Sequence, residues 1–145
     1  MKTVFTITYE HPIHKVFPYL AEPERWLEYV PALIERTKIG DGPVGPGTKW
    51  KSIDRVGPLK VEFTDELVEL EPNSRVVFRQ SSPWNSLVEY RVEADGDRTV
   101  LHVHWEGKLE GKIRWLDLMP DSWATKVFMT EMKRISDVLA EDSDA

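Results

Sequence analysis

Two side chains in this 145-residue sequence are candidates for acid–base chemistry. Asp54 and Tyr90 lie in segments where charged and uncharged residues alternate, and the alternation turns both toward an apolar interior. A carboxylate beside apolar walls has its pKa raised toward neutrality, where it can accept and return protons. Asp54 is therefore the candidate acid or base, with Tyr90 as its catalytic partner. The alternative is that Asp54 is a solvated turn residue ahead of Gly57-Pro58.

The same alternation predicts a surface for binding a small molecule. Charged residues such as Lys49, Lys51 and Glu89 occupy one face of the expected strands, and the opposite face is mostly apolar with a few polar groups. Apolar walls with few polar groups are typical of a ligand pocket. A filled core whose polar groups bond one another, or lie near water at strand ends, is the alternative. The candidate ligand-binding residues on this face are Trp50, Ser52, Phe63, Phe78, Gln80, Ser86, Tyr90 and Trp105.

The C-terminal part of the chain adds further candidates. Phe128, Met132, Ile135 and Leu139 follow helical spacing as one apolar stripe, which predicts a helix of about 20 residues. We expect Phe128 to line the pocket. Trp115 and Met119 precede this helix and could overhang the pocket mouth. Trp123 falls off the stripe, so it either packs under another element or is exposed.

Other kinds of chemistry find little support. The chain has no cysteine, which removes disulfides and thiolate metal sites. His102 and His104 lie two apart, as a metal site could use, but their parity turns them outward and favours a solvated pair. The segment 40–47 contains several glycines but lacks the Lys-Ser/Thr ending of a phosphate-binding loop. We therefore expect no metal and no cofactor.

The order of elements predicts how these residues are positioned. The first ten residues alternate as a strand, and Pro12 and Pro23 each open a short helix. Turn residues then separate six strands at about 33–40, 48–56, 59–70, 75–82, 85–94 and 98–107. The predicted fold is α+β: a seven-stranded curved antiparallel sheet wrapped around the long C-terminal helix, with two short helices between the first two strands. The length suits a single domain spanning residues 1–145.

Composition limits the expected partners. The net charge is −6 and the 19 basic residues are scattered, which argues against nucleic acid. No apolar stretch approaches the roughly 20 residues of a membrane span, and the N-terminus lacks the apolar block of a signal peptide. We expect a cytoplasmic protein. It could be a monomer, or a homodimer formed through an exposed Trp123 or through the outer face of the sheet.

Several motifs, taken in order, resemble those of one superfamily. They are His11-Pro12-Ile13-His14-Lys15-Val16-Phe17, Pro23-Glu24-Arg25-Trp26, Gly42-Pro43-Val44-Gly45-Pro46-Gly47-Thr48 and Leu70-Glu71-Pro72. Together with the order of elements, they make the chain similar to the START-like (SRPBCC) superfamily, of the polyketide cyclase/dehydrase and lipid transport type. The resemblance implies a helix-grip fold with a deep pocket between the sheet and the long helix. It does not imply one function, because members include lipid carriers, hormone receptors, co-chaperones and aromatic cyclases.

Three functional hypotheses follow. The first is a non-catalytic module that binds a hydrophobic small molecule, such as a lipid, an aromatic or a polyketide-like compound. The second is a cofactor-free polyketide cyclase or dehydratase that uses Asp54 and Tyr90. The third is a co-chaperone-like or structural interaction module that works through the outer face of the sheet, and it predicts a collapsed pocket.

Overall fold

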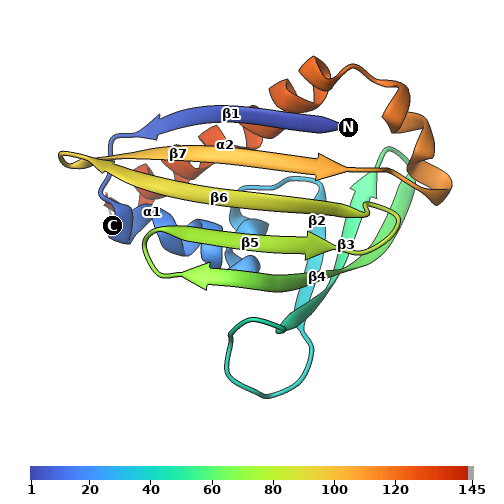
Figure 1. The fold of residues 1–145 in the computed structure, drawn as a ribbon, viewed down its shortest axis with the longest axis horizontal. Coiled ribbons are helices and arrows are strands. Elements are labelled where there is room, and N and C mark those ends of the chain that lie inside the picture. The colour runs from blue at the N-terminus through green and yellow to red at the C-terminus, as the bar shows by residue number, and fades with distance from the viewer. Residues whose placement is uncertain (144–145) are drawn as a thin grey trace.

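The computed structural model describes residues 1–143, and within them seven antiparallel strands form one sheet in the order β1-β7-β6-β5-β4-β3-β2. The sheet curves around one side of α2, the long C-terminal helix (Figure 1). The predicted α+β helix-grip fold is confirmed. The elements are β1 (Lys2–Tyr9), α1 (Ile13–Ala21), η1 (Pro23–Glu28), β2 (Leu33–Lys38), β3 (Lys49–Val56), β4 (Leu59–Glu71), β5 (Arg75–Gln80), β6 (Ser86–Asp95), β7 (Arg98–Gly107), η2 (Gly111–Leu118) and α2 (Asp121–Ser143).

The alternating sequence explains the two faces of the sheet. In β6 and β7, Val88, Val92, Leu101 and Val103 are buried on the concave face. Charged residues on the convex face pair across neighbouring strands, as Lys51 does with Glu62 at 3.4 Å. The alternation is interrupted where the pairing of β2 with β3 shifts between Leu33 and Glu35, and where that of β4 with β5 shifts between Leu67 and Glu69.

The two proline-opened helices cover one end of the concave face. α1 begins directly after Pro12 and buries Val16, Phe17, Tyr19 and Leu20. η1 is a 3₁₀ helix that starts at Pro23 and buries Trp26. A proline is tolerated at the start of a helix because the missing N–H would have no partner there.

Long-range bonds fix α2 across the remaining concave face. The hydroxyl of Tyr9 in β1 donates to the carbonyl of Met132 at 2.8 Å, and Nε of Arg134 donates to the carbonyl of Tyr29 at 3.1 Å. At the start of α2, the backbone N–H of Lys2 donates to Oδ1 of Asp121 at 3.2 Å. The helix is therefore held by β1 and by the segment after η1, with one face turned toward the sheet. None of the helices in residues 1–143 is long and apolar enough to cross a membrane.

Candidate functional site

A cavity of about 210 Å³ lies between the concave face of the sheet and α2. Its walls are mainly aromatic and aliphatic, and every strand contributes to them. Two of its wall residues on α2, Trp123 and Val127, are exposed to solvent, which marks the mouth. The lining includes Trp26, Arg36, Asp54, Phe63, Gln80, Trp84, Tyr90, Trp105, Ala124, Phe128 and Glu131.

Several of the residues predicted to bind a ligand line this cavity. Phe63, Gln80, Tyr90 and Trp105 reach it from four neighbouring strands, and Phe128 reaches it from α2. Phe128 packs edge-on against Phe5 of β1, with ring centroids 5.5 Å apart. Asp54 of β3 also lines the cavity and is half-buried, so the structure does not support its alternative as a solvated turn residue.

Trp50 and Phe78 point inward as predicted but lie outside the cavity lining. Trp26 of η1 packs edge-on against Phe78, with centroids 5.2 Å apart, and Phe78 contacts Trp50 at 6.2 Å. The indole N–H of Trp50 donates to Oε1 of Glu24 at 2.7 Å. η1 therefore fills this end of the concave face, and Trp26 forms the cavity wall in place of the two strand residues.

Ser52 and Ser86 also lie outside the lining, because both belong to a buried polar network. Asp65 is its centre: one carboxylate oxygen accepts from Arg36 at 2.5 Å and from Ser52 at 2.7 Å. The other oxygen accepts from Gln80 at 3.1 Å, and the side-chain carbonyl of Gln80 accepts from Ser86 at 2.6 Å. The network forms a fixed polar floor, of which Arg36 and Gln80 reach the cavity.

Arg36 is a site residue that the sequence prediction missed. Its side chain is 1% exposed, and its guanidinium lies 4.5 Å from the centre of the Trp26 ring. Simple alternation would place Arg36 and Leu33 on opposite faces. The register shift between Leu33 and Glu35 turns both residues inward, as a β-bulge does.

Asp54 has the environment of an acid–base group. Burial raises the pKa of Asp54 to about 7, against the charge of Arg36, which lowers it. The charge of Asp65 raises this pKa further, and the indole N–H of Trp84 lowers it. The Trp84 nitrogen is itself buried and stays outside hydrogen-bonding geometry with any residue of the described chain. Trp84 therefore influences the Asp54 carboxyl without completing a hydrogen bond to it.

Glu131 of α2 is a second carboxyl on the cavity wall, and it was not among the predicted residues. Burial raises the pKa of Glu131 to about 7, the charge of Asp54 adds to the rise, and Arg134 lowers it. Asp54 and Glu131 are therefore two carboxyls with raised pKa values on the walls of one cavity, and the charge of Asp54 reaches Glu131. A signal was present in the sequence: Glu131 lies three residues after Phe128 and four before Ile135, on the apolar stripe itself.

Tyr90 lies close to this pair. Its side chain is 1% exposed, and burial followed by the charge of Glu131 raises the pKa of its hydroxyl well above the ordinary value. Among residues 1–143 its hydroxyl has no hydrogen-bonding partner. It is therefore a neutral group that can donate to, or accept from, an occupant of the cavity.

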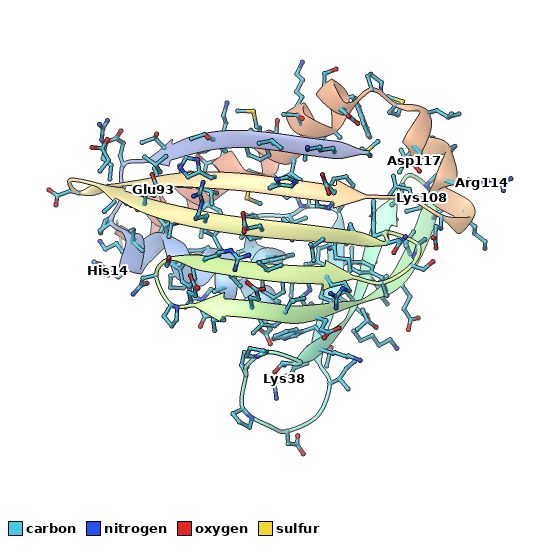
Figure 2. The ribbon with its side chains drawn as sticks, in the orientation of Figure 1. His14, Lys38, Glu93, Lys108, Arg114 and Asp117 are labelled. Atoms are coloured by element: carbon cyan, nitrogen blue, oxygen red, sulfur yellow. The ribbon has the colours of Figure 1, made fainter. Side chains whose placement is uncertain are left out.

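Of the residues considered for the pocket mouth, Trp123 lines the cavity, whereas Trp115 and Met119 do not. Trp115 is 52% exposed on η2, and Met119 packs partly against the core, so neither lines the cavity. Asp117 accepts a hydrogen bond from the backbone of Leu109 at 3.1 Å and so holds η2 against the end of β7. Figure 2 shows Asp117, Lys108 and Arg114 together at this end of the molecule. Trp123, for which the sequence left two alternatives, is 38% exposed and lines the mouth.

The two histidines two residues apart lie on the convex face. Nε2 of His102 lies 3.4 Å from Oε2 of Glu93 in β6. Nε2 of His104 lies 3.3 Å from Oε1 of Glu106. Figure 2 labels Glu93 on the strand beside β7. The described residues contain no group of three side chains arranged to hold a metal ion.

Comparison with known families identifies the relationship. A family model described as polyketide cyclase/dehydrase and lipid transport matches residues 2–141. The chain belongs to this family. The resemblance found in the sequence motifs is confirmed, and membership supports hydrophobic-ligand binding in general. A sequence comparison with the curated proteins finds no match.

Solved structures share the fold at low sequence identity. A protein from Nitrosomonas europaea is 13% identical with a TM-score of 0.76, over 100% of this chain and 97% of that chain. A conserved protein from Geobacillus kaustophilus is 14% identical with a TM-score of 0.75, over 97% and 96%. A norcoclaurine synthase point mutant from Thalictrum flavum, in complex with a transition-state analogue, is 13% identical with a TM-score of 0.69, over 99% and 96%.

Proposed function

We propose that this protein binds a small hydrophobic molecule containing an aromatic ring in the cavity between the sheet and α2. The observation that carries the proposal is the cavity itself: an open, mainly apolar space whose few polar groups include Tyr90 without a hydrogen-bonding partner in the described chain. A space of this kind provides affinity through its walls and orientation through its polar groups. A collapsed pocket, which the interaction-module hypothesis requires, does not fit this observation.

The size of the cavity favours a compact ligand. An apolar cavity of about 150 Å³ in another protein is large enough to bind benzene. The cavity here has a volume of about 210 Å³, which suits a one- or two-ring molecule better than an extended lipid chain. Phe63, Trp105 and Phe128 line this space, and their side chains can pack against such rings.

Calorimetric titration with 2-naphthol, a neutral two-ring probe, tests the proposal. Ala124 lines the cavity, so Ala124→Leu places a larger side chain inside it. We expect 2-naphthol to bind the unmodified protein and to lose about tenfold or more of its affinity in Ala124→Leu, which corresponds to about 1.4 kcal/mol. The larger side chain fills empty space in the cavity, so the melting temperature should not fall.

Lys126→Leu is the matched control, because Lys126 is exposed on the same helix and lies outside the lining. Its affinity for 2-naphthol should equal that of the unmodified protein. An unmodified protein that does not bind the probe, or equal binding by Ala124→Leu, would contradict the proposal. Native mass spectrometry of gently purified protein would then identify the ligand that the cell supplies.

A second function, catalysis of proton transfer, is favoured by the carboxyl pair. A general acid or base works best when its pKa lies near the working pH, and the pKa values of Asp54 and Glu131 both rise to about 7. One carboxylate would remove a proton from a carbon beside a ketone, and solvent would return it. 2-Tetralone in D₂O tests this activity, with deuterium incorporation read by mass spectrometry. Exchange above the buffer rate that is lost in Asp54→Asn supports catalysis, and exchange at the buffer rate contradicts it.

A further inference from the structure

The charges that line the cavity are unbalanced. The guanidinium of Arg36 is already paired with Asp65, whose side chain is fully buried. Arg134 donates to the Tyr29 carbonyl and forms no ion pair with Glu131 among the described residues. Asp54 and Glu131 are therefore left without an ion-pair partner on the walls of an apolar space. Two unpaired carboxylates in such a space repel each other, and either a proton or a cation relieves the repulsion.

Independent features of the same cavity suit a bound cation. Tyr90 lines the cavity, its hydroxyl forms no hydrogen bond within residues 1–143, and it can accept from an ammonium group. The cavity walls include several aromatic rings, and the faces of aromatic rings attract cations, most strongly when water is excluded. The protein already uses this interaction at the cavity floor, where Arg36 lies over Trp26.

We propose that the preferred occupant is a small hydrophobic amine, held as an ammonium ion between the carboxylates of Asp54 and Glu131. This inference rests on the proposed function and names the chemical class of its ligand. The ring lies among the aromatic walls, and the ammonium group donates to the two carboxylates and to Tyr90. A neutral ring of the same shape fills the same walls but leaves the carboxyl pair to hold a proton.

Proton release distinguishes the two kinds of ligand. Near pH 6.5 the free protein holds protons on Asp54 and Glu131, whose pKa values are about 7. The charges that face them are Arg36 and Asp65 at Asp54, and Arg134 at Glu131, all of which are present with and without ligand. A bound ammonium favours both carboxylates and expels their protons, so amine affinity rises as the pH increases toward about 7.

The experiment compares 2-phenylethylamine with 2-phenylethanol by calorimetry. The two probes have the same ring and the same chain length, and they differ in charge at neutral pH. At pH 7.5 we expect the amine to bind about 10- to 100-fold more tightly, because hydrogen bonds between charged groups are stronger than those of a neutral hydroxyl. At pH 6.5 the apparent enthalpy of amine binding should depend on the ionisation enthalpy of the buffer, and that of the alcohol should not.

Variants of the two cavity carboxyls test whether the ammonium group binds between them. Asp54→Asn and Glu131→Gln keep the shape of the cavity and remove one charge each, and both should reduce the preference for the amine. Asp137→Asn is the control, because Asp137 is exposed on the same helix and outside the cavity. It should leave the preference unchanged. Melting curves of each variant show that the fold is retained.

Every outcome bears on the proposal. Tighter binding of the amine that both cavity variants weaken and Asp137→Asn leaves intact supports it. Equal or tighter binding of the alcohol overturns it and leaves the proposed function standing. A preference for the amine that survives in both cavity variants also overturns it, because the ammonium group then lies elsewhere. Binding of neither probe overturns this inference, and the 2-naphthol titration decides separately whether the cavity binds a ring at all.

Discussion

The carboxyls of Asp54 and Glu131 lower the stability of the folded protein when they ionise. A carboxyl whose pKa is higher in the native state than in the unfolded chain holds its proton more tightly when folded. The pKa of Asp54 rises from 3.8 to about 7, and that of Glu131 from 4.5 to about 7. Above pH 7 both must ionise in an environment that disfavours the charge. A purely structural core would gain stability from neutral residues at these two positions.

Substitution of Asp54 should therefore change the pH dependence of stability. From about pH 4 to pH 7 the native state holds a proton on Asp54 that the unfolded state has lost, so stability falls as the pH rises. Asp54→Asn removes this fall. Denaturant unfolding should show the variant close to the unmodified protein at pH 4 and about 2–4 kcal/mol more stable at pH 8. Asp137→Asn should show no such trend, and parallel pH profiles for Asp54→Asn and the unmodified protein would contradict the assignment.

Substitution of Asp65, which forms a buried ion pair with Arg36, should lower the stability of the protein, whereas substitution of Asp54 should raise it. Asp65→Ala leaves the Arg36 guanidinium, 1% exposed, without its counter-charge and also removes acceptors from Ser52 and Gln80. Loss of one partner of a buried ion pair costs about 3–5 kcal/mol. Glu62→Ala, which breaks an exposed pair with Lys51, should cost about 1 kcal/mol or less. Urea unfolding of both variants measures the difference, and equal losses would show that the buried network contributes little.

Individual site residues could be predicted only where local alternation held. Asp54, Phe63, Gln80, Tyr90 and Trp105 follow the two-residue period and line the cavity. Arg36 could not be found in this way, because a register shift that depends on pairing with β3 turns it inward. Glu131 interrupts an apolar stripe with a charge, and only the position of the cavity against α2 shows why a charge is placed there. The two-residue alternation of a strand predicts which face of the sheet a residue is on. Whether that face borders the cavity or packs against another element depends on the neighbouring helices and strands.

The end of β7 shows how an element shapes the cavity. Trp105 lines the cavity, and its ring lies so close to Gly107 that a Cβ there would be 2.9 Å from the ring and 2.8 Å from Cβ of Ser86. Glycine at this position therefore allows β7 to pair with β6 while the indole turns inward. The antiparallel meander from β2 to β7 was predictable from its turns, whereas the pairing of β1 with β7 was not predicted. The inward insertion of Trp26, which excludes Trp50 and Phe78 from the cavity, depends on how η1 packs and was not predictable.

Gly107→Ala tests the role of this strand end. The added methyl group must displace Ser86 or the Trp105 ring, and overpacking of this kind costs about 1–3 kcal/mol. Because a displaced Trp105 would move into the cavity, affinity for 2-naphthol should fall as well. Gly45→Ala is the control, since nothing lies within 4 Å of a Cβ at Gly45. A melting temperature for Gly107→Ala equal to that of Gly45→Ala would show that β7 adjusts without strain.

At the scale of the whole molecule, the cavity lies between elements from opposite ends of the chain. β1 and α2 are joined by the Tyr9 and Lys2 hydrogen bonds, each between residues more than 100 positions apart. A ligand in the cavity contacts both sides of this junction and therefore binds only the folded state. Ligand binding should consequently stabilise the entire fold and not a single hairpin.

Thermal unfolding with added ligand measures this coupling. At a 2-naphthol concentration about 100 times its Kd, the free energy of unfolding should rise by about 2.7 kcal/mol. The melting temperature should increase with ligand concentration in the unmodified protein and in Lys126→Leu. It should rise less in Ala124→Leu, where a tenfold weaker affinity reduces the gain in the free energy of unfolding to about 1.4 kcal/mol. A rise of the same size in Ala124→Leu would place the ligand outside the cavity.

The placement of the tryptophans allows ligand binding to be followed by intrinsic fluorescence. Trp26, Trp84, Trp105 and Trp123 line the cavity, whereas Trp50 is enclosed behind η1 and Trp115 is exposed on η2. An occupant would alter the emission of the four cavity indoles together. Trp50 would continue to emit as a buried indole and Trp115 as a hydrated one. Occupancy can thus be followed in unlabelled protein, with two internal references encoded in the same chain.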